Sequence, residues 1–579
     1  MDGIFGFFGN QEPTLFKQMH NNLLHRVGNK IQEIHANKIS LGYGCCRQLH
    51  WQHTAETGIA TRGSITLAVC GFFTNAKQQY SPELLITLYQ KNGIEALCQL
   101  QGSFLIALSD NKDGYLIRDG AGQRTIYYSE QNGRLLFAIE PKGIHQTTGF
   151  QRRLNVDSLV QYLSFSFVPG VNTMLENLYE LPPGHYLHWK GKLYQSFLHR
   201  YYQFERVEKT ARSEPEWLKQ FQQTFSDCVA DRRASQQEVG VFLSGGMDSS
   251  VVTAELARQH ELKIQSFSLH FGKSYHNELK FAAAVAKRCH TKHHVFEIKP
   301  QNFLQRLREI IWYLDDPIGD PITMPNYELA SYARDHVEWI FNGEGGDPCF
   351  GGPKNYGMML LHWYGEAKRD TFYQEDAYLK SFKRAYTELD HLFTPEFSAQ
   401  INRQEQLYSV LTPFFNSEKP AGYLDKLMAM NIRLKGAHLI LPKVDRMLGA
   451  NGFCSLSPLF DERIIELSFA IPSTLKLAGG DEKVIIKRAF KNRLPNRIIT
   501  RPKVGMRVPV HFWFKNELKS YMRHIFSRNA INRAGIFSYE RIQQLMSYDT
   551  GEVQPRYGLK LWMLLTFEMW RRRVIENEE

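Results

Sequence analysis

The sequence predicts an N-terminal part of packed antiparallel β-sheets with helices, followed by a parallel α/β part with additional helices. Residues 1 to about 205 contain short apolar runs bounded by Gly, Asn and Asp, which is typical of stacked antiparallel strands. From residue 206 onward, apolar strands alternate with longer helical patterns, which favours a parallel sheet. A chain of 579 residues is also too long for one hydrophobic core. We therefore expect two domains, over residues 1–205 and 206–579.

Short apolar runs mark individual strands of the N-terminal part. Residues 65–69, 104–108 and 135–139 are each bounded by turn residues, so we expect three strands there. Residues 181–184, with the sequence Leu-Pro-Pro-Gly, indicate a turn. The sequence becomes charged and helical after residues 201–202, and the domain boundary is placed there.

Composition excludes several classes of protein. No run reaches the roughly 18 apolar residues of a membrane helix, and the first residues lack the basic start and cleavage site of a secretory signal. We therefore expect a cytoplasmic protein whose eight scattered cysteines are reduced. The net charge of +11 is spread along the chain apart from residues 571–573, which favours a solvated basic surface over a nucleic-acid partner. The run at 559–570 has apolar residues at helical spacing and predicts a core helix.

A glycine-rich turn between a strand and a helix predicts a nucleotide site. Residues 239–243 have the pattern of a buried strand, and residues 249–258 have the pattern of a helix. The turn between them has the sequence Ser244-Gly245-Gly246-Met247-Asp248-Ser249.

The residue types of this turn suit a polyphosphate. Gly245 and Gly246 let backbone N–H groups approach an anion, Ser244 and Ser249 offer hydroxyls, and the helix start adds partial positive charge. Asp248 would repel phosphate unless a divalent cation lies between them, so Mg²⁺ is expected. The turn lacks the lysine of the Gly-Lys-Ser/Thr nucleotide loop, so it is a different phosphate-binding element.

A second glycine-rich turn, Asn342 to Asp347, follows the apolar run 337–341. Asp347 could supply another carboxylate to the same metal, and Glu344 could face the reacting centre. Because parallel strands end at one edge of a sheet, we expect the two turns to share a crevice.

Further strings complete a resemblance to the asparagine synthetase superfamily over nearly the whole chain. They are Arg118-Asp119, Tyr127-Tyr128, Leu181 to Tyr186, Asp315-Asp316-Pro317, Asp445-Arg446-Met447, Pro458 to Asp461 and Arg501 to Gly505. The turn at Ser244 resembles the pyrophosphate-binding loop of ATP pyrophosphatases, which cleave ATP between its α- and β-phosphates. The resemblance implies a glutaminase-like domain over 1–205 and, over 206–579, a domain that uses ATP and Mg²⁺ to adenylate a carboxylate.

The resemblance also implies which residues hold ATP. Leu243 and Leu269 would contact adenine through their backbones, and Gly343 and Lys483 would contact phosphate. Asp248 and Asp347 would bind magnesium.

Two further residues would act on the reacting groups. Glu344 is the candidate base. Lys503, twenty positions after Lys483, would stabilise the anionic tetrahedral state as an amine displaces AMP.

The N-terminal part departs from the glutamine-using pattern. Such enzymes carry a nucleophilic cysteine after the initiator methionine, but this chain has Asp2, whose carboxylate is a poor nucleophile toward an amide. The family's glutamine-binding strings are replaced by residues 70–72 and 80–82, and no Arg-Leu-Ser string occurs near Arg47. We expect no glutaminase activity and a degenerate domain that is a structural remnant or a platform for a partner or large substrate.

The acceptor pocket departs from the pattern as well. Asparagine synthetases have an acidic residue and an arginine before their Pro-Phe-Leu-Asp string, whereas this chain has Cys454 and Leu456 before Pro458. The arginine suited to the α-carboxylate of aspartate is therefore missing, and free aspartate is not the expected substrate.

These departures favour an amine already present in the substrate. The chain resembles lasso peptide cyclases, which join a peptide's N-terminal amine to an Asp or Glu side chain, and this is the leading hypothesis. It implies a role in antibiotic biosynthesis, with a leader peptidase and a precursor-recognition protein as partners. Three alternatives stay open: a β-lactam synthetase, although those enzymes have tyrosine in place of Glu344; an ammonia-dependent asparagine synthetase; and a non-catalytic scaffold.

Overall fold

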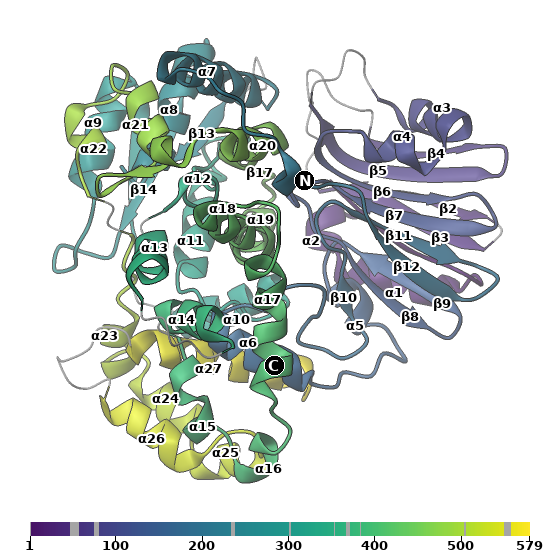
Figure 1. The fold of residues 1–579 in the computed structure, drawn as a ribbon. Helices are drawn as coiled ribbons and strands as arrows, with labels where there is room; N and C mark the ends of the chain where they lie inside the picture. Colours follow the sequence, from purple (N-terminus) through teal and green to yellow (C-terminus); the bar gives the residue numbers. More distant parts are fainter. Residues whose placement is uncertain are drawn as a thin grey trace.

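The computed structural model describes residues 2–36, 38–46, 57–74, 80–232, 238–299, 303–352, 354–365, 371–382, 384–502, 505–548 and 557–578. The N-terminal part is built on two six-stranded antiparallel sheets, seen on the right of Figure 1. The strands of the first sheet are β1 (Asp2–Phe8), β2 (Ile31–Ala36), β3 (Ile39–Cys45), β8 (Tyr127–Gln131), β9 (Arg134–Ala138) and β10 (Tyr179–Glu180). Those of the second are β4 (Gly58–Arg62), β5 (Ile65–Phe73), β6 (Gly102–Ser109), β7 (Asp113–Arg118), β11 (His185–Lys190) and β12 (Gln195–Arg200).

The order of strands is β10-β8-β9-β1-β3-β2 in the first sheet and β12-β11-β7-β6-β5-β4 in the second. The helices of this part are α1 (Pro13–Asn22), α2 (Leu24–Val27), α3 (Pro82–Asn92), α4 (Ile94–Cys98), α5 (Lys142–His145) and α6 (Val156–Phe165).

Strand β5 shows how side-chain alternation builds this part. Ala68 and Cys70 belong to the core between the two sheets, whereas Leu67 and Val69 point to the other face and pack in the core that includes residues of α3 and α4. Alternate residues of a strand face opposite sides of its sheet, so one strand serves two apolar layers. The strands predicted at 65–69, 104–108 and 135–139 are confirmed as parts of β5, β6 and β9.

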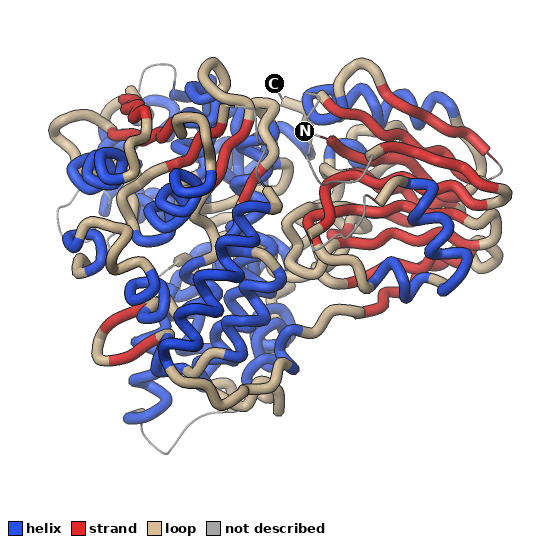
Figure 2. The backbone as a smooth tube through the Cα atoms, turned by 90° about the horizontal axis from the view of Figure 1, so that it is seen from above, coloured by secondary structure: helices blue, strands red, loops and turns tan. Residues whose placement is uncertain are grey.

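The C-terminal part contains a five-stranded parallel sheet with helices on both faces, visible from above in Figure 2. Its strands are β13 (Val239–Phe242), β14 (Gln265–His270), β15 (Lys292–Glu297), β16 (Trp339–Phe341) and β17 (Ser455–Leu456). Their order is β15-β14-β13-β16-β17, so the chain runs outward from β13 in one direction and then returns beside it with β16. The adjacent strands β13 and β16 therefore form a topological switch point, where α/β sheets bind ligands.

Helices lead into this sheet, connect its strands and surround it. They are η1 (Phe204–Arg206), α7 (Glu214–Ala230), α8 (Met247–Gln259), α9 (Leu279–Arg288), α10 (Phe303–Leu314), α11 (Thr323–Ala333), α12 (Gly346–Phe350), α13 (Lys354–Tyr364), α14 (Tyr373–Phe382), η2 (Tyr386–Glu388), α15 (Leu389–Leu392), α16 (Pro395–Ser398), η3 (Gln404–Tyr408), α17 (Ser409–Phe415), α18 (Tyr423–Met430), η4 (Asn431–Ile440) and α19 (Leu441–Gly449).

The remaining elements follow β17. They are η5 (Pro458–Phe460), α20 (Glu462–Ala470), η6 (Ser473–Leu475), the hairpin β18 (Leu477–Ala478) and β19 (Asp481–Glu482), α21 (Val484–Ala489), α22 (Asn496–Ile499), α23 (Val510–Lys515), α24 (Lys519–Ile525), α25 (Arg528–Ala534), α26 (Tyr539–Tyr548) and α27 (Tyr557–Val574). Helix α27 contains the predicted core helix, with Trp562 and Leu565 fully buried.

The fold class predicted from the sequence is confirmed, with two local corrections. The helix after β13 begins at Met247, two residues before the predicted start, so Asp248 and Ser249 lie in its first turn. Strand β16 begins at Trp339, two residues later than predicted.

All eight cysteines are free thiols. Within the described ranges, none of the helices combines the length and the apolar character needed to cross a bilayer.

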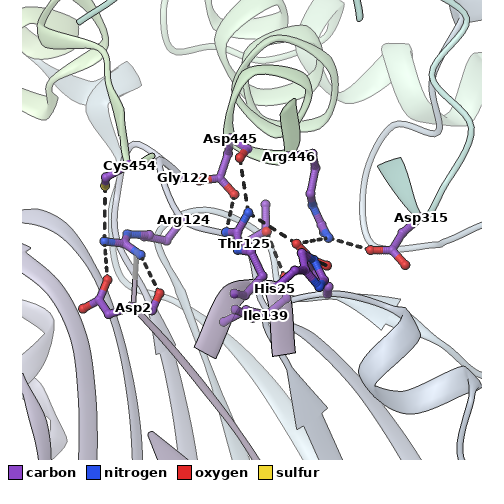
Figure 3. A network of polar contacts seen from close by, with 12 residues as sticks. Asp2, His25, Gly122, Arg124, Thr125, Ile139, Asp315, Asp445, Arg446 and Cys454 are labelled. Atoms are coloured by element: carbon purple, nitrogen blue, oxygen red, sulfur yellow. Dashed lines mark hydrogen bonds and ion pairs between the residues drawn. The ribbon is translucent and has the colours of Figure 1, made fainter. Parts of the chain in front are cut away.

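A buried cluster of ion pairs joins the two parts of the molecule (Figure 3). Arg26 of α2 lies 2.8 Å from Asp445 and 3.3 Å from Glu140. Arg446 of α19 lies 2.7 Å from Asp315 and 3.3 Å from Glu140. Removing one member of such a buried cluster leaves the others without compensation, which typically costs about 3–5 kcal/mol.

Lys142 completes this cluster from the N-terminal side. Its ammonium lies 2.5 Å from Glu140 and 2.8 Å from Asp315. Burial favours the neutral form of Glu140, but Lys142 and the other cations around it hold the pKa of Glu140 well below its usual range. Glu140 is therefore ionised near neutral pH.

Candidate nucleotide and adenylation site

A cavity of about 260 Å³ opens at the carboxyl ends of β13, β14 and β16. It lies at the switch point of the parallel sheet, between the two glycine-rich turns. The lining includes nine of the residues singled out in the sequence: Leu243, Ser244, Gly246, Asp248, Ser249, Leu269, Gly343, Glu344 and Asp347. The expected shared crevice is therefore present in the structure.

The first turn is shaped by hydrogen bonds among its own residues. The Gly246 N–H donates to the Ser244 hydroxyl at 3.2 Å, and the Ser244 and Ser249 hydroxyls lie 3.0 Å apart. Gly245 has a φ of +77°, and a Cβ there would lie 2.5 Å from the backbone nitrogen of Ala282, so only glycine fits. Gly245 itself does not line the cavity.

Helix α8 starts directly at this turn. Gly246 is its N-cap residue, and Asp248 lies in its first turn. The unpaired N–H groups of a helix start attract anions, so this end of α8 suits the phosphates of a nucleotide.

Lys483 brings the acids of the two turns together. Its ammonium lies 2.5 Å from Asp248 and 2.5 Å from Asp347, although the three residues are far apart in sequence. Lys483 is buried and has a φ of +54°, which is uncommon for a residue with a Cβ. This backbone conformation at the start of α21 indicates that the surrounding fold constrains Lys483.

The acid pair fits the predicted magnesium site in its chemistry. Mg²⁺ prefers carboxylate oxygens, usually one or two from protein together with phosphate oxygens and water. Asp248 and Asp347 reach one common ammonium, so both can approach one small cation. Within the described residues no group of three or more His, Cys, Asp or Glu side chains has metal-binding geometry.

The second turn is held by Asn342, and it places Glu344 at the cavity. The Asn342 side-chain oxygen accepts a hydrogen bond from the Glu344 N–H at 3.1 Å and another from the Ser457 hydroxyl at 2.8 Å. Gly343 packs against the start of α8, where a Cβ would lie 2.5 Å from the Ser249 nitrogen. The two turns are therefore in contact, and Glu344 lines the cavity beside them.

Leu243 and Leu269, the residues expected to contact adenine, both line the cavity. The sheet already uses the Leu243 N–H, which donates to the Phe267 carbonyl at 2.8 Å. The Leu243 carbonyl accepts from the Ser268 hydroxyl and keeps a second lone pair. A backbone contact from Leu243 to a base therefore uses the carbonyl.

Lys503 lies outside the described residues. The Arg501 guanidinium donates to the Gly245 carbonyl at 3.1 Å. Gly505, Met506 and Arg507 line the cavity. Within the described part of the Arg501 to Gly505 string, Arg501 therefore contacts the nucleotide turn and Gly505 lines the cavity.

Position 2 lies in a separate buried site in the N-terminal part (Figure 3). The Asp2 carboxylate lies 2.8 Å from the Arg124 guanidinium and accepts a 2.8 Å hydrogen bond from the Gly71 N–H. Burial favours the neutral acid, but Arg124 and the Gly71 N–H hold the pKa of Asp2 below its usual value. Arg124 also donates to the Cys454 sulfur at 3.6 Å, which links this site to the C-terminal part.

Neither Arg124 nor the orienting role of Asn342 is predicted by the sequence pattern. A single arginine in a turn carries no pattern that would distinguish it. Asn342 was part of the second glycine-rich string, but its partner Ser457 is 115 positions away and only the fold brings them together.

Two family models match the chain and together cover most of it. A model described as "Asparagine synthase" matches residues 220–572. A model described as "Glutamine amidotransferase domain" matches residues 1–202.

Two curated relatives are similar to this chain over most of its length and of their own. "Asparagine synthetase [glutamine-hydrolyzing] 1" of Bacillus subtilis is 25% identical over 525 residues, which cover 86% of this chain and 81% of the relative. A protein of Gibberella zeae named as an amidase is 23% identical over 551 residues, covering 84% of this chain and 80% of its own. The two relatives differ in the activity that their names state.

Proposed function

This chain belongs to the asparagine synthase family of ATP-dependent amide-forming ligases, and we propose that it adenylates a carboxylate and couples it to an amine without using glutamine. The proposal rests above all on the cavity lined by Asp248, Asp347 and Glu344, because both aspartates also pair with the buried Lys483. Members of the family generally use ATP with Mg²⁺. Bound Mg²⁺ would offset the phosphate charge, and Asp248 and Asp347 are the residues that would hold it.

Different residues around the cavity have different roles in the proposed reaction. The start of α8 and Lys483 bind and orient the phosphates, and Glu344 is placed by Asn342 to take a proton from the attacking amine. The carboxylate oxygen attacks the α-phosphorus, and the bond to the leaving pyrophosphate breaks. The amine then attacks the acyl carbon, and AMP leaves.

The environment of Asp2 favours the proposal that the nitrogen comes from a donor other than glutamine. The carboxylate is buried, ionised and held by Arg124 and Gly71, so it has neither the nucleophilicity nor the freedom to attack an amide. The amine would then come from the substrate, which favours a ring-forming reaction such as lasso peptide cyclisation. The leading substrate is therefore a peptide with an internal Asp or Glu.

Two exposed aromatic side chains on α13 are compatible with a substrate larger than an amino acid. Helix α13 begins two residues after Gly352, whose N–H donates to the Asp347 carbonyl at 3.1 Å. At the other end of this helix, Trp363 and Tyr364 are 62% and 81% exposed. A peptide with apolar side chains could cover them while its carboxylate reached the cavity.

The test measures AMP and pyrophosphate formed from ATP and Mg²⁺ with synthetic core peptides that carry one internal Asp or Glu. The proposal predicts AMP together with a peptide that is lighter by one water, and loss of both products in Asp248→Ala with an unchanged unfolding midpoint. Asparagine formed from aspartate and ammonium would identify an asparagine synthetase instead. AMP formation with only small amino-acid carboxylates would support a β-lactam-type ligase, and no AMP with any carboxylate would support a scaffold.

A further inference from the structure

Arg501 lies behind the wall of the cavity and contacts the nucleotide turn from there. Its own side chain does not line the cavity. The guanidinium donates to the Gly245 carbonyl at 3.1 Å and forms an ion pair with the Glu278 carboxylate. Only 9% of the Arg501 side chain and 12% of the Glu278 side chain are exposed, so salt and water screen this pair little.

The same guanidinium stacks on an aromatic ring of helix α9. It lies 3.9 Å from the centre of the Phe281 ring, a distance at which a cation is attracted to the face of the ring. Phe281 also packs against the nucleotide turn, because a Cβ added at Gly245 would lie 2.8 Å from the Phe281 Cβ. Three contacts of different kinds therefore hold the planar guanidinium beside Gly245.

These contacts connect three segments that line the cavity. The nucleotide turn supplies Gly246 to the lining, the residue before α9 supplies Glu278, and the segment after Arg501 supplies residues 505–507. Arg501 contacts the first two segments and begins the third. One side chain outside the cavity therefore holds three parts of its wall together.

The Gly245 carbonyl and the Gly246 N–H belong to one peptide group. A hydrogen bond from a charged donor draws electron density toward the carbonyl oxygen, which makes the N–H of the same peptide a stronger donor. Gly246 lines the cavity, and its N–H donates to the Ser244 hydroxyl at 3.2 Å, a long hydrogen bond that a phosphate oxygen could replace. The contact of Arg501 with Gly245 therefore strengthens an anion-binding group that Arg501 does not touch.

We propose that Arg501 is a positioning residue for the phosphates of the nucleotide, which orients and polarises the Gly245–Gly246 peptide through the Gly245 carbonyl. This inference rests on the proposed function, in which the start of α8 binds the phosphates. Glu278 completes the arrangement, because it balances the charge of Arg501 and is itself balanced where it lines the cavity. Loss of Arg501 should therefore weaken the binding of polyphosphate and not that of a nucleoside.

The test compares two probes that separate the phosphates from the nucleoside. Pyrophosphate with Mg²⁺ and adenosine are titrated by calorimetry at fixed ionic strength, and no turnover is needed. We expect Arg501→Met to raise the Kd of pyrophosphate at least about tenfold, while the Kd of adenosine changes less than about twofold and so reports a folded cavity. Arg501→Lys keeps the charge but lacks the planar fork, and it should recover part of the loss.

Two further variants separate the peptide contact from simpler effects of charge. Arg501→Met leaves the Glu278 carboxylate at the cavity without its counter-charge, which would by itself repel pyrophosphate. The double variant Arg501→Met with Glu278→Gln removes that carboxylate and should keep most of the loss. Arg493→Met is the matched control: Arg493 pairs with Glu255 of α8 at 2.6 Å but does not line the cavity. It should leave both Kd values unchanged.

Three results would overturn the proposal. They are wild-type pyrophosphate binding in the double variant, which would trace the loss to the Glu278 charge; equal weakening of pyrophosphate and adenosine, which would mean a general disturbance of the cavity; and wild-type protein that binds no pyrophosphate at about 10 mM. The adenylation assay has a separate outcome. AMP formation by the wild type with normal pyrophosphate binding by Arg501→Met would contradict this inference alone. The expected loss in Arg501→Met without AMP formation from any carboxylate would contradict only the proposed function.

Discussion

Asp2 and Arg124 form a buried ion pair at 2.8 Å, at the position where glutamine-hydrolysing relatives would need a nucleophile. We expect Asp2→Ala to lower the free energy of unfolding by about 3 kcal/mol, because it leaves the Arg124 guanidinium buried without a counter-charge. Urea unfolding measures the change. The double variant Asp2→Ala with Arg124→Met should recover most of the loss, and equal losses in the single and double variants would contradict this explanation.

Restoring a cysteine should not restore glutamine hydrolysis. In Asp2→Cys the Arg124 guanidinium can still donate to the backbone carbonyl of residue 2, and the family's glutamine-binding strings remain absent. We expect glutamate release from glutamine to stay at the wild-type background in an enzyme-coupled assay. Release clearly above that background would show that the pocket still binds glutamine.

Gly343→Ala should separate the two turns. The added Cβ would lie 2.5 Å from the Ser249 nitrogen and 2.7 Å from the Asp248 carbonyl carbon, so the second turn or the start of α8 must move. We expect the Kd of ATP to rise at least about tenfold in calorimetry.

Gly357→Ala is the matched control for this prediction. Gly357 lies in α13 with no atom within 4 Å of its Cβ position, so alanine there should leave ATP binding unchanged and slightly stabilise the helix. Normal ATP binding by Gly343→Ala would show that the turns can separate without loss.

Lys483→Met should reduce AMP formation by about 100-fold or more, because a charged group facing the phosphates is lost and the Asp248 and Asp347 carboxylates are left facing each other. Lys487→Met removes a charge from the same helix, where Lys487 pairs with Asp481 at 2.8 Å. That control should keep wild-type turnover. Equal rates for the two variants, measured as pyrophosphate release, would exclude a role for Lys483 at the phosphates.

The raised pKa of Asp316 predicts that stability depends on pH. Burial, with Asp315 and Glu180 nearby, raises the pKa of Asp316 to about 7. In the unfolded chain Asp316 ionises at its ordinary, lower pKa. The free energy of unfolding therefore decreases as pH rises from about 4 to about 7, and it does not decrease further above that range.

The variant Asp316→Asn should therefore raise the unfolding midpoint more at pH 8 than at pH 5. The Met174 N–H, which donates to Asp316 at 3.3 Å, can still donate to the amide oxygen. Thermal unfolding at the two pH values measures the difference. Equal gains at both pH values would mean that Asp316 is ionised in the folded protein throughout this range.

The sequence allowed the sheets and the nucleotide turns to be predicted because these features depend on local pattern. The apolar run 65–69, bounded by turn residues, and the glycine pair at Gly245 and Gly246 determine local backbone structure. The ion pair of Lys483 with Asp248 and Asp347 could be expected only through a family resemblance, since the partners are 235 and 136 positions apart. Roles that depend on contacts between remote residues, such as those of Arg124 and Asn342, could not be predicted from the sequence.

The charged cluster between the two parts affects how this protein could be shortened. A gene that encoded only residues after 206 would leave Asp445, Arg446 and Asp315 at a new surface without Arg26, Glu140 and Lys142. The N-terminal half produced alone would expose the opposite set. Each part therefore supplies the counter-charges for buried groups of the other, so the N-terminal part contributes to stability although its second residue is not a nucleophile.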